Sequence, residues 1–107
     1  MANKNVSLTV VKTNYDKDRK YATVYGHAYH VNYKVDGIEI KKVSGGSSDL
    51  TQYNVVDQAL KSVLYRASTR YYTADVTINN ATLPKSLQSF LKDKYETETQ
   101  INSVTFA

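Results

Sequence analysis

The chain has 107 residues, no cysteine, and 14 basic against 10 acidic side chains, which gives a formal net charge of +4. This length predicts one domain over residues 1–107, the absence of cysteine excludes disulfides and thiolate metal sites, and the basic balance argues against a protein that imitates DNA. The sequence has no apolar run long enough to span a bilayer and no signal-peptide core, so we expect a cytoplasmic protein.

Three strands are predicted in the first part of the chain. In NVSLTVVKT, residues 5–13, apolar side chains recur at every second position, as in a strand with one buried face. The charged stretch NYDKDRK, residues 14–20, predicts a turn. A second strand, YATVYGHAYHVNYKV, covers residues 21–35. The VDGIEIKKV stretch then contains Asp36-Gly37, a pair typical of a tight hairpin turn before a third strand.

The SGGSSDLTQ stretch breaks the strand pattern and leads into the first predicted helix. This helix is expected to run from Leu50 to Arg66, capped by Ser48 or Asp49, with Gln52 placed to complete a capping box. Apolar side chains recur at helical spacing along it and predict one buried stripe: Val56, Ala59, Leu60, Val63, Leu64 and Ala67.

A strand, a helix and a strand complete the predicted elements. ADVTIN, residues 74–79, is the fourth strand. Thr82 and Pro84 begin the second helix, because proline is tolerated in the first turn. TQINSVTF, residues 99–106, is the fifth strand. The side chains expected to form the buried side of the second helix are Leu83, Leu87, Phe90 and Leu91.

The chain resembles the ribonuclease H-like fold in the order of its elements over nearly its whole length. The pattern is most similar where YGHAYHVNYKVDGIEIKKVSGG leads into TQYNVVDQALKSVL, a small-residue strand and hairpin followed by a turn and an alanine- and leucine-bearing helix. The resemblance implies an α/β (α+β) domain of order βββαβαβ, with a five-stranded mixed sheet in the order 3-2-1-4-5 and two helices on one face. Full members of the family also have a C-terminal helix, which we expect to be absent here. Another α/β sandwich is the alternative.

The carboxylates that hold two metal ions in this family are missing at the matching positions. The predicted first strand has no acid, the helix glutamate falls near Val55 with Asp57 on a different face, and Asn80 stands at the end of the fourth strand. Two divalent ions need several carboxylate ligands. His27 and His30 point to opposite faces of a regular strand and do not converge on a metal. We therefore expect a non-catalytic relative, a pseudoenzyme without metal or cofactor.

The predicted second strand has one tyrosine face and one face that begins with small residues. In the 3-2-1-4-5 order both crossovers move the same way, so right-handed connections place both helices on one sheet face and leave the other bare. The small residues suit the close approach of a helix, which assigns the tyrosines to the bare face; the reverse orientation would make them core. These tyrosines are Tyr21, Tyr25, Tyr29 and Tyr33.

A basic rim at the first hairpin complements this tyrosine face. Tyrosines can stack on unpaired bases while basic side chains follow phosphates, so we expect a non-enzymatic protein that binds nucleic acid or a nucleoprotein. The alternatives are a protein-directed inhibitor or adaptor of the phage or mobile-element type, a homodimeric structural module, and a cryptic nuclease. No membrane partner is expected. The predicted rim consists of Lys12, Lys17, Arg19 and Lys20.

Overall fold

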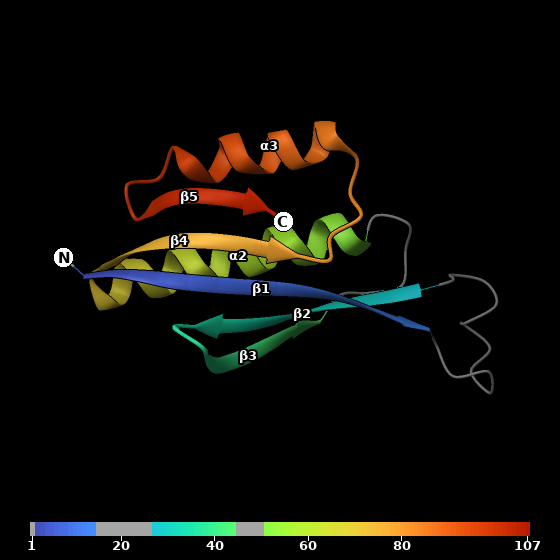
Figure 1. The fold of residues 1–107 in the computed structure, drawn as a ribbon, viewed down its shortest axis with the longest axis horizontal. Helices are drawn as coiled ribbons and strands as arrows, with labels where there is room; N and C mark the ends of the chain where they lie inside the picture. Colours follow the sequence, from blue (N-terminus) through green and yellow to red (C-terminus); the bar gives the residue numbers. More distant parts are fainter. Residues whose placement is uncertain (1, 15–26, 45–50) are drawn as a thin grey trace.

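The computed structural model describes residues 2–14, 27–44 and 51–107, which form one five-stranded mixed sheet and two helices (Figure 1). The predicted α+β class is therefore confirmed. The helices are α2 (Thr51–Arg70) and α3 (Lys85–Glu96). The strands are β1 (Ala2–Asn14), β2 (His27–Val35), β3 (Ile38–Ser44), β4 (Tyr72–Asn79) and β5 (Ile101–Phe106).

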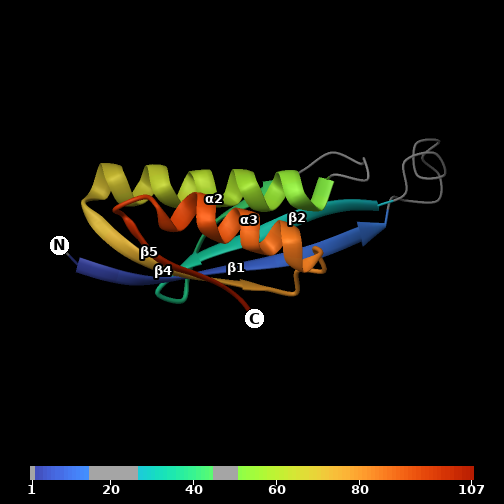
Figure 2. The same cartoon turned by 90° about the horizontal axis from the view of Figure 1, so that it is seen from above.

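The sheet has the strand order β3-β2-β1-β4-β5, with β1 at its centre. β1 is antiparallel to β2 and parallel to β4, β2 is antiparallel to β3, and β4 is parallel to β5. This is the order expected from the sequence. Both helices lie on the same side of the sheet, with α3 beside β5 at its edge (Figure 2). Within the described residues, neither helix combines the length and hydrophobicity needed to cross a membrane.

The turn between β2 and β3 is the predicted tight hairpin. Asp36 and Gly37 have φ angles of 50° and 83°, and positive φ at both central residues is the mark of a turn that suits the twist of a hairpin. The Asp36 carboxylate accepts a 2.9 Å hydrogen bond from the Asn5 backbone N–H, and the Asp36 N–H donates to the Asn5 carbonyl at 2.8 Å. The turn is therefore tied to β1 as well as to its own strands.

Helix α2 continues one turn beyond Arg66, where the sequence pattern places its end. Ala67 is fully buried, so the packed stripe extends into the added turn. The Thr69 hydroxyl donates to the Arg66 carbonyl at 3.2 Å, and the helix ends before Tyr71, whose φ is 57°. Packing of one alanine therefore outweighs the weak helix propensity of the serine and threonine around it.

Gln52 makes contacts other than those of the predicted capping box. Its amide nitrogen donates to the Thr82 hydroxyl at 2.9 Å, and its amide oxygen accepts the Thr82 backbone N–H at 2.7 Å. This paired contact ties the start of α2 to the segment before α3. The predicted caps Ser48 and Asp49, and Leu50 beside them, lie outside the described residues.

The predicted buried stripe of α2 is confirmed, and that of α3 is wrong at one position. Val56, Leu60 and Val63 are fully buried against the sheet. In α3, Leu91 is fully buried, but Phe90 is 56% exposed. The reason is that α3 packs beside the edge strand β5, so only a narrow stripe of the helix meets the core.

The tyrosine face of β2 is turned toward the helices, so the prediction that this face is open is wrong. Tyr33 is 1% exposed, and Tyr29 is half-buried against the core. The register pairs Tyr33 with Leu8 of β1, so the buried face of the central strand fixes the buried face of its neighbour. Tyr21 and Tyr25 lie outside the described residues, as do most of the small residues that favoured the opposite assignment.

The sheet face opposite the helices is polar. Serine, threonine and asparagine side chains of β1 and β4 occupy it, and several pair with each other. Asn79 donates to the Ser7 hydroxyl at 3.0 Å, and the Asp75 carboxylate accepts hydrogen bonds from Asn3 at 2.7 Å and from Ser103 at 2.9 Å. In the part of the chain described, neither helix covers this face, and its composition is that of a solvated sheet surface.

Candidate functional site

A groove runs between the C-terminal half of α2 and the strands β2 and β3 at the sheet edge. It consists of two adjoining hollows of about 430 and 300 Å³, which share Ile40, Arg66 and Arg70 in their walls. We call this feature the α2–β3 groove. The other charged and aromatic residues that line it are Lys4, Tyr33, Asp36, Lys41, Lys61, Tyr65 and Tyr72.

The secondary structure brings the groove residues together from three elements. Arg66 and Arg70 are four positions apart on α2, so they lie on one face of the helix. Tyr33 reaches the groove because its face of β2 is turned toward α2. Lys41 is the direct partner of Tyr33 across the β2–β3 pair. The register of that pair shifts after Tyr33, which leaves Ile40 as an additional residue in the groove wall.

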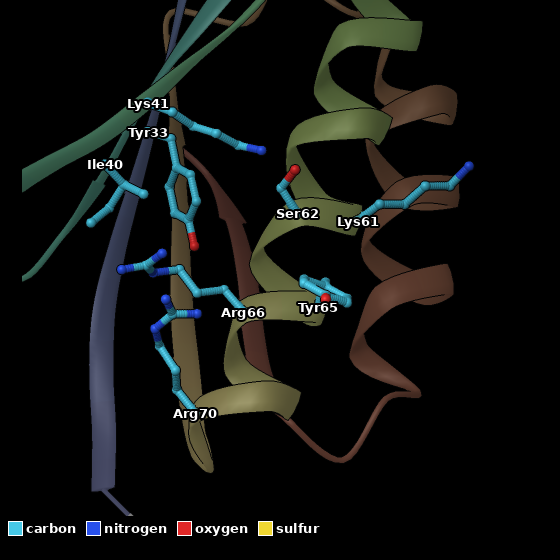
Figure 3. A pocket seen from close by; sticks show the side chains of 8 residues that line it. All are labelled: Tyr33, Ile40, Lys41, Lys61, Ser62, Tyr65, Arg66 and Arg70. Carbon is cyan, nitrogen blue, oxygen red and sulfur yellow. The ribbon is translucent and has the colours of Figure 1, made fainter.

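The groove carries more positive charge than its own ion pairs neutralise. Lys61 lies 3.4 Å from the Asp57 carboxylate and points away from the groove in Figure 3. Lys4 lies 3.6 Å from the Asp36 carboxylate.

Three further cations have no carboxylate partner within the described residues. They are Lys41, Arg66 and Arg70. Among the described residues, the Arg70 guanidinium makes one side-chain hydrogen bond, a long one of 3.5 Å to the Thr69 hydroxyl. The groove therefore carries uncompensated positive charge, which favours an anionic ligand.

Two tyrosine hydroxyls are buried in the wall of the groove beside Arg66 and Arg70. They belong to Tyr33 and Tyr72, which are close enough to interact with each other, and neither oxygen has any other hydrogen-bond partner among the described residues. Burial, and then the neighbouring Tyr72, raise the pKa of Tyr33 above its ordinary value, so its hydroxyl stays protonated and can donate. The positive charges of Arg66 and Arg70 oppose that rise. Figure 3 shows the Tyr33 hydroxyl directed at both guanidinium groups.

Of the residues predicted from the sequence to bind, Tyr33 alone lies in the groove within the described part of the chain. Tyr29 is half-buried in the core, and Lys12 is exposed on β1 beside it in the register. The structure therefore does not bring the described tyrosines together on an exposed surface. Five predicted residues lie outside the described ranges: Lys17, Arg19, Lys20, Tyr21 and Tyr25.

The sequence does contain a signal for the groove, in YRASTRYY at residues 65–72. Each arginine is next to a tyrosine there, and the two arginines have helical spacing. Placing the end of the helix at Arg66 hides this pattern, because Arg70 then belongs to a loop. Lys41 and Tyr72 lie in the groove only because their strands pair with other strands of the sheet, and the local sequence does not predict that pairing.

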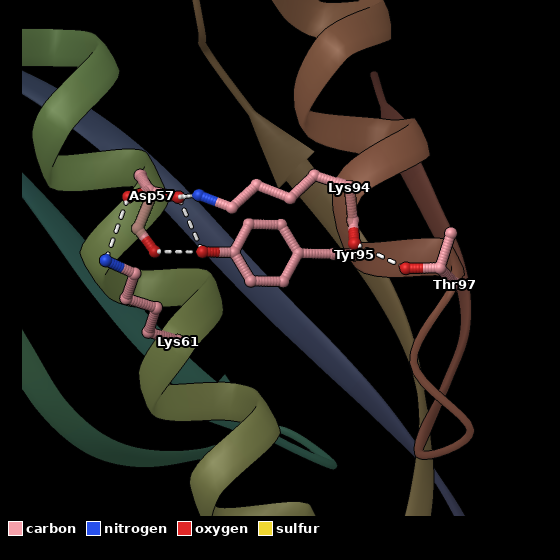
Figure 4. Close-up of polar contacts among 5 residues, drawn as sticks. All are labelled: Asp57, Lys61, Lys94, Tyr95 and Thr97. Carbon is pink, nitrogen blue, oxygen red and sulfur yellow. Dashed lines mark hydrogen bonds and ion pairs between the residues drawn. The ribbon is translucent and has the colours of Figure 1, made fainter.

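A second polar cluster joins α2 to α3 around Asp57 (Figure 4). The Tyr95 hydroxyl donates to the Asp57 carboxylate at 2.5 Å, and Lys94 donates at 3.0 Å. Burial by itself would raise the pKa of Asp57, but these two hydrogen bonds and the nearby lysines outweigh it, and the pKa is lowered. Burial, followed by the Asp57 contact, raises the pKa of Tyr95. The cluster connects α2 to α3, and its hydrogen bonds and ion pairs occupy the Asp57 carboxylate.

The positions that would match metal ligands of the resembling family carry other chemistry. Val55 is fully buried, and Asn80 is exposed with a φ of 64°. Across residues 2–14, 27–44 and 51–107, no three histidine, aspartate or glutamate side chains are grouped to hold a metal ion. His30 is half-buried, and burial followed by the charge of Lys42 lowers its pKa.

Comparison with known protein families, characterised proteins and solved structures finds no significant match to this chain. What the chain binds must therefore be inferred from its own side chains. Among the described residues, the α2–β3 groove combines a concave shape, uncompensated cations and two buried hydroxyls that have no partner but each other. Convergent polar groups in a hollow are the usual mark of a binding site.

Proposed function

We propose that this chain is a non-catalytic binding protein that engages nucleic acid, free or in a nucleoprotein, through the α2–β3 groove. The observation that carries the proposal is a set of three cations in the groove that have no carboxylate partner among the described residues: Lys41, Arg66 and Arg70. Cations that neutralise phosphates and release condensed counterions supply most of the affinity of nonspecific nucleic-acid binding. The groove thus takes the place of the tyrosine face expected from the sequence.

Exposed tyrosines beside these cations favour a single strand over a duplex. Tyr65 lines the groove and is 72% exposed, and Tyr71, directly after Arg70, is 77% exposed. An aromatic ring that is left in solvent next to basic groups offers a stacking platform for an unpaired base, worth about 1–3 kcal/mol per base. In a duplex the bases are already stacked on each other and do not reach such a ring.

A ribonuclease H-like relationship is part of this proposal. It is supported by the strand order β3-β2-β1-β4-β5, with β1 antiparallel to β2 and parallel to β4. The non-catalytic part of the proposal is supported by the absence of acids from β1 and by Asp57, whose carboxylate is already engaged by Tyr95 and Lys94.

Fluorescence anisotropy with a short labelled oligothymidylate, titrated at several salt concentrations, tests the proposal. We expect saturable binding that weakens as salt increases. The double variant Arg66→Gln/Arg70→Gln should bind at least about tenfold more weakly. It should also lower the slope of log K against log salt by about 0.7 per lost contact, or roughly 1.4 for the pair.

The matched control is Lys42→Gln/Lys85→Gln, which removes the same charge from exposed positions outside the groove. This control should retain most of the affinity. Equal losses in the two double variants would mean that net charge, and not the groove, governs binding. The absence of salt-dependent binding in the wild-type protein would refute the proposal outright.

A further inference from the structure

The inner end of the α2–β3 groove brings four hydrogen-bond donors to one place. Arg66 and Arg70 share a face of α2, and the hydroxyl of Tyr33 is directed at both (Figure 3). Tyr72 lines the adjoining hollow with the same two arginines. Each guanidinium presents several N–H groups in a planar fork, which suits the oxygens of phosphate and carboxylate groups.

The two hydroxyls are the unusual part of this arrangement. Tyr33 is 1% and Tyr72 is 3% exposed, yet apart from their contact with each other neither oxygen has a hydrogen-bond partner among the described residues. Buried polar groups in native proteins are almost always paired, because an unpaired one loses its water without compensation. Two buried hydroxyls beside two cations, at the wall of an open hollow, form the arrangement expected of an anion-binding site.

We infer that the inner end of the α2–β3 groove, formed by Arg66, Arg70 and the hydroxyls of Tyr33 and Tyr72, binds a phosphomonoester, such as the terminal phosphate of a nucleic-acid strand. This inference rests on the proposed function and names the group that the site receives. Lys41 and Tyr65 line the same hollow as the two arginines, so a strand anchored by its terminal phosphate would have a further cation and an exposed ring beside it.

The number and kind of donors favour a monoester over the other anions that a protein meets. An internal phosphodiester has two free oxygens and a single negative charge. A phosphomonoester has three free oxygens and about 1.5 to 2 negative charges at pH 7. Two guanidinium groups balance that charge, and the neutral hydroxyls add donors without adding charge. A carboxylate leaves part of this donor set unused.

The first test compares two oligothymidylates that differ only in a 5′-phosphate, together with inorganic phosphate as the smallest probe. We expect the phosphorylated strand to bind roughly tenfold more tightly than the hydroxyl strand, as for a charge-assisted bidentate contact. Inorganic phosphate should compete with the phosphorylated strand. It should also shift the side-chain Nε–H resonances of Arg66 and Arg70 in ¹⁵N-edited spectra.

The double variant Tyr33→Phe/Tyr72→Phe keeps both rings and removes only the hydroxyls. Because the two hydroxyls have no partner but each other among the described residues, and are removed together, this variant should fold with an unchanged or higher melting temperature. It should lose the preference for the phosphorylated strand and keep the salt-dependent binding of the hydroxyl strand. The control Tyr53→Phe, at a half-buried tyrosine that packs near Phe90 outside the groove, should keep the preference.

The outcomes separate this inference from the proposed function. Equal binding of the two strands with no response to inorganic phosphate overturns the phosphomonoester site and leaves the nucleic-acid groove standing. Arginine shifts with inorganic phosphate, without binding of either strand, support the site for a small phosphomonoester and reject the nucleic acid. A preference for the 5′-phosphate that survives Tyr33→Phe/Tyr72→Phe also contradicts the inference, since the assigned hydroxyls then contribute nothing.

Discussion

Leu8 of β1 and Tyr33 of β2 are direct partners across the antiparallel pair, and both side chains are buried under α2, with exposures of 0% and 1%. The ring of Tyr33 therefore belongs to the core, and its hydroxyl reaches the wall of the α2–β3 groove. One side chain thus serves packing through its ring and the candidate site through its oxygen. These two roles can be separated by substitution.

We predict that the ring of Tyr33 is needed for stability and that its hydroxyl is not. Tyr33→Ala should lower the free energy of unfolding by about 3–5 kcal/mol, the range for a large aromatic side chain truncated in a core. Tyr33→Phe should cost far less than Tyr33→Ala, because the hydroxyl that it removes has no partner among the described residues except the neighbouring Tyr72 hydroxyl. Urea denaturation measures both. A destabilisation by Tyr33→Phe comparable to that of Tyr33→Ala would show that the hydroxyl has a structural partner.

The contact between Asp57 and Tyr95 should contribute to stability through the hydroxyl. The Tyr95 hydroxyl donates to a carboxylate that is mostly buried, with 14% of the side chain exposed. Tyr95→Phe should therefore cost about 1.5–3 kcal/mol, the range for a hydrogen bond to a charged group. The exposed Tyr65 is the matched control, and Tyr65→Phe should change stability by less than about 0.5 kcal/mol. Equal denaturation midpoints for the two variants would show that the hydrogen bond between Asp57 and Tyr95 does not stabilise the folded protein.

Stability should fall at acid pH, in part through Asp57. Its pKa in the folded protein is below the ordinary value of 3.8, so the unfolded chain binds more protons at pH values between the two. The contribution is complete above the unfolded pKa and is lost as the pH falls through the folded pKa. Glu96, whose pKa is lowered by Lys92 and by the Val104 N–H, acts in the same direction.

The test of this pH dependence compares the wild-type protein with Asp57→Asn. Denaturation at neutral pH and in the acid range should show a smaller loss of stability on acidification in the variant, since one of the shifted carboxylates is gone. The variant should also be less stable at neutral pH. Parallel curves for the two proteins would mean that Asp57 titrates with the same pKa in the folded and unfolded states.

The elements that follow strong periodic patterns are the ones that the sequence predicts well. The alternation in β1, the Asp36-Gly37 turn and the stripe through Leu60 are local signals, and each leads to the observed element. The observed strand order is the one that the family resemblance implied, and no local pattern in the sequence predicts it.

The sequence is less informative about which face of β2 is buried. Tyrosine suits either a core or a surface, so the tyrosines do not decide the question. Val31 and Val35 have the same parity as Tyr33 and are buried with it. Those valines, with the register to Leu8, are the better guide.

The groove could not be predicted because it depends on three elements at once. Arg66 and Arg70 belong to the end of α2, where packing of Ala67 sets the helix length. Lys41 enters through a shift in strand register that no local pattern encodes. Whether a hydroxyl is left without a partner is a property of the packed structure alone.

The stripe of α2 should dominate the stability of the helix–sheet packing. Leu60 is fully buried, and Gln58, two positions before it, is exposed. Leu60→Ala should cost about 2–5 kcal/mol through lost transfer energy and the cavity that remains. Gln58→Ala should stay within about 0.5 kcal/mol. Similar midpoints for these two variants would contradict the packing of this helix face.

Finally, we predict no metal-dependent nuclease activity, because two metal ions require several carboxylates around one site. β1 has none, Val55 is buried, and Asn80 provides an amide in place of a charge. Incubation with an RNA–DNA hybrid and with single- and double-stranded DNA, in magnesium and in manganese, should leave the substrates intact. Cleavage that elutes with the protein in size-exclusion chromatography, and that a folded Asp57→Asn variant lacks, would show that Asp57 leaves its contact with Tyr95 to hold a metal ion. Cleavage that this variant retains at full rate would instead identify a contaminating nuclease.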